Sequence, residues 1–206
     1  SMDSHKLRNK ALKAIDETNF YPSKGKERLK SMIETRPDWC VSRQRVWGVP
    51  LPIFINKKTS EILVDDEVFD NIAKIYEKEG SDCWFSDDPQ KFLGKKYKAK
   101  DFEKLSDIVE VWFDSGSTHS FVLEKRKDLK WPASMYLEGS DQHRGWFHSS
   151  LLESCGTRGK APFESILSHG FVVDGKGLKM SKSLGNVIAP EDILKKYGAD
   201  ILRIWV

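Results

Sequence analysis

The sequence predicts an α/β fold with a parallel sheet. Three runs, at 108–113, 134–137 and 166–173, have the length and the apolar composition of buried strands. Segments with helical periodicity lie between and after these runs, and polar loops follow them. Strands that alternate with helices and end in loops of functional composition are typical of open parallel sheets.

Composition places the chain among globular proteins. It has 206 residues, 39% of them hydrophobic and 32% charged, and a formal net charge of +3. This supports a packed core in one or two domains. The longest stretch without Asp, Glu, Lys or Arg, Val46 to Asn56, is far shorter than the roughly 20 apolar residues that cross a bilayer. We expect no membrane span, and because no secretory signal pattern opens the chain, we expect a cytoplasmic protein.

The three cysteines favour the same compartment. Cys40, Cys83 and Cys155 stand alone in the sequence, with no C-x-x-C pair. An odd number of widely spaced thiols is typical of a reducing cytosol, where cysteine serves as a small buried side chain. Without paired ligands the cysteines predict no zinc site.

Residues 1–36 form a basic helical segment with nine Lys/Arg and five Asp/Glu. Helical spacing predicts a first helix over 6–17. A second helix has Ser23 as its expected N-cap and ends before Pro37. The apolar positions that define the two helices are Leu7, Ala11, Ala14, Ile15, Leu29, Met32 and Ile33. The excess positive charge is consistent with a surface for a polyanion and equally with a solvated helix face.

Residues 51–106 have the pattern of an inserted module. Pro50 to Ile55 and Glu61 to Val64 flank a polar turn, which predicts a hairpin. Apolar residues from Val68 to Tyr76 then mark one face of a helix that ends at Gly80. The remainder of the module is polar and weakly periodic.

The strands return after this module. The run 108–113 leads into a loop of small residues, and 134–137 leads into a turn, Glu138 to Asp141, that we expect to cap the next helix. Gly156 suits the end of that helix, and 166–173 is the third strand. The apolar residues expected on the helix are Trp146, Phe147 and Leu151.

The last part of the chain predicts two short helices. Pro190 suits the first turn of one that runs to Tyr197, and Gly198 closes it. A further helical pattern begins at Ala199 and stops on apolar side chains with no polar tail. An apolar helix face needs a partner, so we expect the chain to be part of a longer protein.

The loop between these helices and the third strand carries the strongest motif, Lys-Met-Ser-Lys-Ser at 179–183. Two lysines three residues apart, flanked by Gly and Ser, can both reach one polyphosphate. Nucleotidyl transfer needs such cations to stabilise the charge that develops at phosphorus. Taken alone, the same residues describe an exposed basic turn. The loop is not a Walker P-loop, because the G-x-x-x-x-G-K-[ST] pattern does not occur.

Three further segments join this loop in a resemblance to a known family. Arg36 to Pro50 contains Arg-Pro-Asp-Trp-Cys-Val-Ser-Arg-Gln-Arg, Asp107 to Ser117 contains Val-Trp-Phe-Asp-Ser-Gly, and Leu137 to Phe147 contains Glu-Gly-Ser-Asp-Gln-His-Arg-Gly-Trp. In this order the four segments resemble the isoleucyl-tRNA synthetases, of class I of the aminoacyl-tRNA synthetases. The resemblance covers nearly all of 6–206, and the Ser-Asp-Gln-His segment is similar to the bacterial type. The valyl and leucyl relatives differ at that segment.

The resemblance implies a domain organisation. It makes 1–36 the helical segment that follows an editing insertion, and 37–50 the return strand and turn of the catalytic domain. It makes 51–106 an α+β connective module, and 107–206 the second half of a Rossmann-like nucleotide-binding domain that carries the lysine loop.

The resemblance also implies roles for individual residues. Lys179 and Lys182 would contact the ATP phosphates. Glu138, with Gly139 and Asp141, would bind the ribose and amino-acid ends of the adenylate. The remaining implied contacts come from Gln142, to the substrate α-amino region, and from Trp112 and Trp146, which would form walls of the isoleucine pocket.

Each of these residues also has a purely structural interpretation. Glu138 and Asp141 can cap a helix, and tryptophans on strands or helices usually pack in cores. Arg43 and Arg45 could approach the end of an RNA, but ordinary salt bridges explain them as well. Only the family resemblance favours the functional interpretation for the two tryptophans.

The resemblance finally implies a reaction and its substrates. The parent protein would be a cytoplasmic, monomeric ligase that uses ATP with Mg²⁺, isoleucine and tRNA-Ile. The family's first signature, His-Ile-Gly-His, and its editing insertion do not occur in this chain. We therefore expect the chain alone to be inactive, and we expect no zinc in it. An inert RNA-binding paralogue is the alternative, although such a module would not need the lysine loop.

Overall fold

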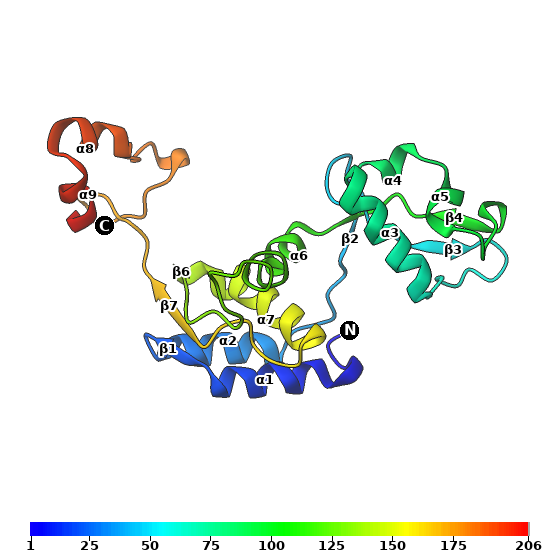
Figure 1. Cartoon of the computed structure of the whole chain (residues 1–206). Helices are drawn as coiled ribbons and strands as arrows, with labels where there is room; N and C mark the ends of the chain where they lie inside the picture. Colours follow the sequence, from blue (N-terminus) through cyan, green and yellow to red (C-terminus); the bar gives the residue numbers. More distant parts are fainter. Residues whose placement is uncertain (206) are drawn as a thin grey trace.

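The computed structural model describes residues 1–205. Figure 1 shows three parts along the chain: a central body, a module formed by the middle of the chain, and a small lobe near the C-terminus. The body contains the parallel sheet and the helices that cover it. The module and the lobe each join the body through short connections.

The sheet of the body has three parallel strands in the order β1-β7-β6. Phe20 pairs with Ile166 on one side of β7, and Tyr136 pairs with Ile166 on the other. The strands are β1 (Asn19–Tyr21), β6 (Tyr136–Gly139) and β7 (Ser165–His169). The expected parallel sheet is therefore confirmed. Strand β6 overlaps the predicted run 134–137, and β7 overlaps only the first part of the predicted run 166–173 because it ends at His169. Strand β1 was not predicted.

Three helices build the core of the body against this sheet (Figure 1). They are α1 (Leu7–Glu17), α2 (Lys24–Glu34) and α7 (Trp146–Thr157). Helix α7 is buried from Phe147 to Cys155, so it forms the centre of the body. Each fully buried Leu, Ile or Phe contributes about 1.5–3 kcal/mol to folding. The core includes Ala11, Ile15, Leu29, Ile33, Phe147, Leu151 and Ile166.

Two predicted helix ends differ from the structure. Ser23 stands at the N-cap position of α2, but its side chain makes no capping hydrogen bond. Its backbone is already helical, which turns the hydroxyl away from the first amides. Gly156 lies inside α7, whereas Gly159, two residues after the helix, has the positive φ of 79°.

The run 108–113 is not a strand, and this prediction was wrong. Only β5 (Ile108–Val109) is extended, and it pairs antiparallel with β2 (Ser42–Arg43). From there the chain forms α6 (Val111–Gly116), because the Glu110 carboxylate accepts a hydrogen bond from the N–H of Trp112 at 3.1 Å. The predicted loop of small residues is thus mostly helical, and it continues into η3 (His119–Leu123).

The module has a core of its own around Trp84, which is fully buried. Its strands β3 (Phe54–Asn56) and β4 (Phe102–Lys104) pair antiparallel. The expected hairpin is present as a short antiparallel contact: Ile55 forms a bridge with Ile62, the N–H of Asn56 donates to the carbonyl of Glu61, and the N–H of Leu63 donates to the carbonyl of Phe54, both at 2.8 Å. Strand β4 pairs with β3 as well. Its helices are α3 (Asp66–Glu79), α4 (Cys83–Ser86) and α5 (Pro89–Leu93), with the turn η2 (Ala99–Asp101). Helix α3 agrees with the prediction.

The two connections to the module lie side by side. The N–H of Leu51 donates to the carbonyl of Asp107 at 2.9 Å, and the N–H of Val109 donates to the carbonyl of Val49 at 2.7 Å. Pro50 also forms a bridge with Ile108. The module therefore leaves and rejoins the body at one place.

The lobe consists of the lysine loop and two helices that pack on each other. They are α8 (Pro190–Tyr197) and α9 (Ala199–Trp205), and both agree with the predicted helices over the described residues. Val206 lies outside the described residues. The remaining short turns are η1 (Ser4–Lys6), η4 (Ser140–Arg144) and η5 (Lys182–Leu184).

Candidate active site

The carboxyl ends of β6 and β7 lie next to each other, with Gly139 opposite His169. Glu138 is exposed there, and its carboxylate accepts a hydrogen bond from the N–H of Gly139 at 3.2 Å. A Cβ on Gly139 would lie 2.6 Å from Oδ1 of Asp141, so a larger residue there would displace the Asp141 carboxylate. Ligands of open α/β sheets bind at this edge.

The turn continues as η4, where Gln142 has the structural role that was expected of Asp141. Its Oε1 accepts a hydrogen bond from the N–H of Trp146 at 2.9 Å, which caps the start of α7. Its Nε2 donates to Oδ2 of Asp141 at 3.1 Å. Asp141 makes no capping bond to α7, and its exposed carboxylate stays open to solvent. Gln142 therefore fixes both the helix and the direction of Asp141.

Trp112 of α6 and Trp146, the first residue of α7, both lie at the start of α7. The ring of Trp112 is 42% exposed, and a Cβ on Gly145 would lie 3.0 Å from it. The indole N–H of Trp146 donates to the carbonyl of Ser115 at 3.0 Å, which ties α7 to α6. The exposed Trp112 face is available to a ligand, whereas Trp146 packs partly against the core.

The lysine loop is held by an asparagine and an aspartate. Nδ2 of Asn186 donates to Oδ2 of Asp174 at 2.9 Å, and Oδ1 of Asn186 accepts from the N–H of Ser181 at 2.9 Å. Asp174 also accepts the backbone N–H groups of Leu178 and Lys176, and the hydrogen bond from Asn186, with these two, holds the pKa of its carboxyl below the usual range. The loop thus has a fixed shape, although Lys179 and Lys182 are both exposed.

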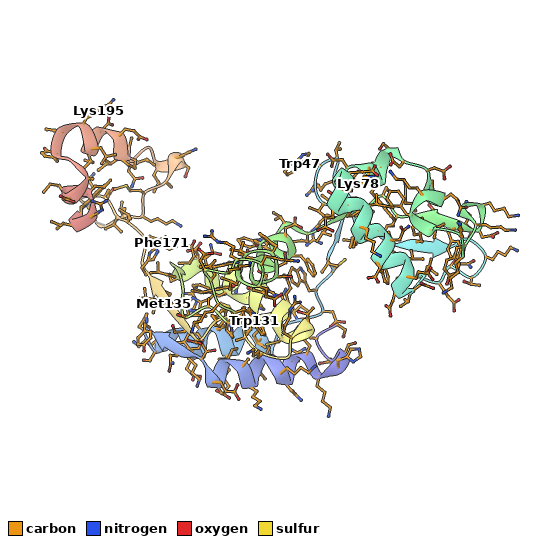
Figure 2. All side chains as sticks on the ribbon, in the orientation of Figure 1. Trp47, Lys78, Trp131, Met135, Phe171 and Lys195 are labelled. Carbon is orange, nitrogen blue, oxygen red and sulfur yellow. The ribbon has the colours of Figure 1, made fainter. Side chains whose placement is uncertain are left out.

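The structure brings some of the predicted residues together and leaves others apart. Residues 138–142, Trp112 and Trp146 all come from the end of β6 and the facing ends of α6 and α7. The lysine loop stands in the lobe, which Figure 1 shows separated from the body beyond β7. There, Nζ of Lys179 lies 3.6 Å from the ring centroid of Phe171, a residue that Figure 2 marks between body and lobe.

Sequence reasoning missed a buried carboxyl group near this site. Glu153 of α7 is 9% exposed, and its Oε1 has no hydrogen-bond partner among the described residues. Burial, with the nearby charges of Asp114 and Glu110, raises its pKa to about 8. A signal existed in the sequence, because Glu153 is the one charged residue in a run of small and apolar residues from Trp146 to Thr157.

None of the helices in residues 1–205 combines the length and the apolar character that crossing a bilayer requires. Over the same range, no group of three or more His, Cys, Asp or Glu side chains is placed to hold a metal ion.

Comparison with known proteins gives a family match over the full length. The family described as "tRNA synthetases class I (I, L, M and V)" matches residues 1–206. The chain belongs to the class I tRNA synthetases. This agrees with the parallel sheet, with the lysine loop, and with the resemblance found in the sequence.

Related proteins support a finer placement within the class I tRNA synthetases. The isoleucine–tRNA ligase of Pelagibacter ubique (strain HTCC1062) is 85% identical over 206 residues, which make up 100% of this chain and 23% of that protein. That of Brucella abortus biovar 1 (strain 9-941) is 59% identical over 99% of this chain and 21% of that protein. The chain therefore spans less than a quarter of the length of these relatives.

Solved structures of class I synthetases have the same fold. LeuRS of Agrobacterium radiobacter K84, in a ternary complex LeuRS–tRNA–LeuAMS, matches 81% of this chain and 23% of its own, with 25% identity and a TM-score of 0.57. Methionyl-tRNA synthetase of Mycobacterium tuberculosis, bound by methionyl-adenylate, matches 97% of this chain and 31% of its own. Its identity is 18% and its TM-score 0.59, which supports the fold alone. The α/β fold class is thus confirmed.

Proposed function

We propose that this chain is the part of an isoleucine–tRNA ligase that holds the second half of the catalytic domain. The observation that carries the proposal is the 85% identity, over the whole chain, to a protein of that name. The lysine loop and the turn after β6 supply the chemistry that the reaction needs. The domain boundaries expected at 36, 50 and 106 belong to the same proposal.

The proposed reaction has two steps. An oxygen of the isoleucine carboxylate attacks the α-phosphorus of ATP, so that pyrophosphate leaves and isoleucyl-adenylate forms. The terminal hydroxyl of tRNA-Ile then attacks the isoleucyl carbonyl, and AMP leaves. ATP enters as its Mg²⁺ complex, so the metal comes with the substrate. The protein contributes mainly positioning and charge stabilisation.

The residues of the body are suited to hold the adenylate. Glu138 and Asp141 present carboxylates at the carboxyl edge of the sheet, where they can accept hydrogen bonds from ribose hydroxyls or from an ammonium group. Gln142 is fixed by its bonds to Trp146 and Asp141, so it can position the α-amino region. The exposed face of Trp112, beside Trp146, offers an apolar wall for the isoleucine side chain.

The lysine loop is suited to stabilise the leaving pyrophosphate. Lys182 is exposed at the start of η5, and Lys179 rests over Phe171. Both ammonium groups lack a salt bridge among the described residues, so neither has to leave a carboxylate to reach phosphate. The proposal requires the lobe to approach the turn after β6 when ATP binds.

The 206-residue chain alone is expected to be inactive. It spans 23% of the most similar ligase described above, and it lacks the His-Ile-Gly-His signature that would supply the other half of the ATP site. The whole protein is proposed to work as a monomer in the cytoplasm. The three free thiols, Cys40, Cys83 and Cys155, support a reducing compartment.

Isoleucine-dependent exchange of pyrophosphate into ATP tests the proposal. The whole protein that contains this chain should catalyse the exchange with isoleucine, and the 206-residue chain should not. Lys182→Gln should lower the rate in the whole protein by roughly 10²–10³-fold, as removal of a preorganised charge does. Lys176→Gln, an exposed lysine before the motif, is the control. Absence of isoleucine-dependent exchange in the whole protein would overturn the proposal.

A further inference from the structure

Helix α6 lies close against α7, and two glycines make this approach possible. Figure 1 shows the two helices side by side in the body. Gly116, the last residue of α6, is buried, and a Cβ on it would overlap the Glu153 carboxylate and lie 3.1 Å from the carbonyl carbon of Ser149. Gly145, directly before α7, makes the second close contact, with the side chain of Trp112.

The contact between Gly145 and Trp112 involves the far end of the indole ring. A Cβ on Gly145 would lie 3.0 Å from Cη2 and 3.2 Å from Cζ3 of Trp112. Carbon atoms of packed side chains prefer separations of about 3.5–4.0 Å. Any side chain at position 145 would therefore displace the ring by a few tenths of an ångström.

The backbone that carries Trp112 cannot take up this displacement. The buried Glu110 carboxylate accepts a hydrogen bond from the N–H of Trp112 at 3.1 Å, which holds the first turn of α6. The contact of Gly116 with α7 holds the other end of α6. Because both ends of this short helix are packed, a Cβ on Gly145 would move the indole ring and leave α6 in place.

The ring of Trp112, in contrast, has room to move. Trp112 is 42% exposed, and across residues 1–205 its ring stacks on no other aromatic ring. Trp146, the second expected wall of the isoleucine pocket, is held by the hydrogen bond from its indole N–H to Ser115 and by the core. Of these two walls, Trp112 is the one whose position depends on Gly145.

Gly145 also leaves space for Gln142. A Cβ on Gly145 would overlap Oε1 of Gln142, the atom that accepts the N–H of Trp146 at 2.9 Å. The nearest neighbours of such a Cβ are thus Gln142 and Trp112, and the proposed function assigns both to isoleucine. The lysines assigned to the ATP phosphates lie in the separate lobe (Figure 1). A change at position 145 should therefore affect the amino acid and spare ATP.

We propose that Gly145 is a positioning residue for the amino-acid substrate, which sets the shape of the isoleucine pocket through the ring of Trp112. The proposal rests on the proposed function, because it requires isoleucine to bind beside Trp112. Glycine has no side chain to offer a substrate, so its effect passes through its neighbours. One methylene group in an apolar pocket changes recognition by roughly 10- to 200-fold, so a wall displaced by less than about 1 Å changes the selectivity of the site.

Pyrophosphate exchange by the whole protein that contains this chain tests the proposal. In Gly145→Ala the KM for isoleucine should rise about tenfold, and the KM for ATP should stay within about twofold. Selectivity for isoleucine over valine, which is one methylene shorter, should fall about threefold or more. Gly156→Ala is the matched control and should change neither KM. It adds the same methyl group within α7, where the nearest atom, Cδ1 of Leu7, lies 3.7 Å away.

Trp112→Phe shows whether Gly145 acts through the indole ring. Phenylalanine is shorter than tryptophan and lacks the two ring atoms that a Cβ on Gly145 would meet. Adding Gly145→Ala to Trp112→Phe should therefore raise the isoleucine KM by only about threefold, the part that arises from Gln142. A tenfold rise in both backgrounds would overturn the proposal, because position 145 would then act without the ring.

A measurement on the 206-residue chain needs no activity. The ¹⁵N–¹H NMR spectrum contains the indole N–H signals of its seven tryptophans, and Trp112→Phe identifies the signal of Trp112. Gly145→Ala should shift that signal and leave the signal of Trp84, buried in the module, unchanged. An unchanged Trp112 signal would overturn the proposal.

Folding and function are controlled separately. If circular dichroism shows that Gly145→Ala does not fold, recovery of folding in the double variant with Trp112→Phe would support the ring contact, and no recovery would overturn it. Absence of isoleucine-dependent exchange in the unmodified whole protein would refute the proposed function. Exchange in that protein, with an unaltered isoleucine KM in Gly145→Ala, would overturn this inference alone.

Discussion

The indole ring of Trp146 lies flat on the phenol ring of Tyr136, with 4.0 Å between the ring centroids and 1° between the planes. Tyr136 begins β6 and Trp146 begins α7, so the stack joins the two ends of the turn that carries residues 138–142. The hydroxyl of Tyr136 also shares a hydrogen bond with Ser150 at 3.2 Å. The geometry of the proposed adenylate site therefore depends on this pair.

Trp146→Ala should lower the free energy of unfolding by about 3 kcal/mol, because it removes the stack and leaves a cavity beside the core. Tyr136→Phe keeps the rings and loses only the hydroxyl bond, so it should cost about 1 kcal/mol. Urea unfolding followed by circular dichroism measures both. Equal losses in the two variants would show that the stack does not hold the turn.

Glu153 should make the stability of the chain fall as pH rises. Its folded pKa is raised to about 8 from an ordinary value of 4.5, so between these values the folded state holds a proton that the unfolded state has lost. The contribution of this group to the free energy of unfolding is fully present below pH 4.5 and is lost as pH rises towards 8. The loss should be smaller than the ~1.4 kcal/mol per pH unit that one full proton allows.

Glu153→Gln isolates this effect, since glutamine has the same shape and does not titrate. Urea midpoints measured at pH 5, 6, 7 and 8 should show the stability of Glu153→Gln, relative to that of the wild type, increasing with each rise in pH. Asp114→Asn should reduce the slope in part, because Asp114 contributes to the raised pKa of Glu153. A difference between Glu153→Gln and wild type that does not vary with pH would contradict the prediction.

Asn186→Ala should loosen the lysine loop. The variant removes the bonds to Asp174 and to the N–H of Ser181, so the Ser181 amide should exchange with solvent about tenfold faster. Asn186→Asp should have the larger effect, because a second carboxylate would face Asp174. Ser183→Ala is the control, as it loses only an exposed contact with Ser181. Hydrogen exchange measured by NMR reports each amide.

Trp84→Ala should unfold the module without unfolding the body. Trp84 packs against Phe54 with 5.1 Å between ring centroids, and its indole N–H donates to Leu105 at 2.7 Å. Its loss should cost about 3–5 kcal/mol. Hydrogen exchange should then increase in β3 and β4 but not in β6 and β7. Trp47→Ala is the control, because this tryptophan is exposed and its loss should change hydrogen exchange in neither pair of strands. If Trp84→Ala also increased hydrogen exchange in β6 and β7, the module and the body would not fold separately.

The predicted boundaries agree best with the structure for helices whose start and end are set by residues within or next to the helix. Helix α3 has Asp65 as its N-cap, whose carboxylate accepts hydrogen bonds from the N–H groups of Glu67 and Val68. Its C-cap is Gly80, with a φ of 82°. Helix α8 has Pro190 in its first turn and Gly198 after its end. These signals lie within a few residues of the helix, so the sequence alone contains them.

Elements that depend on distant partners could not be predicted. Strand β1 has three residues, and it is extended because Phe20 pairs with Ile166, far away in the chain. The run from Val111 to Phe113 has strand-like composition, but the cap by Glu110 and packing on α7 make it helical. Tertiary contacts override propensity in both cases.

In the candidate site, too, features with local sequence signals could be predicted, and features that depend on distant segments could not. Family motifs in the sequence suggested Glu138, Gln142 and the lysines as candidate site residues, but they did not indicate that Gln142 caps α7. The raised pKa of Glu153 arises where α7 meets the segment that carries Glu110 and Asp114. No window of sequence contains such a meeting, so these groups could be found only in three dimensions.

The paired connections at Leu51 and Asp107 have a consequence for how this protein can change. Since the two backbones are already hydrogen-bonded to each other, a short loop between Val49 and Ile108 could close the body without moving β2 or β5. The module can therefore be shortened, enlarged or exchanged for another domain at small cost to the rest of the chain. Descendants of such a protein can acquire or lose whole appendages here while the sheet and the lysine loop stay the same.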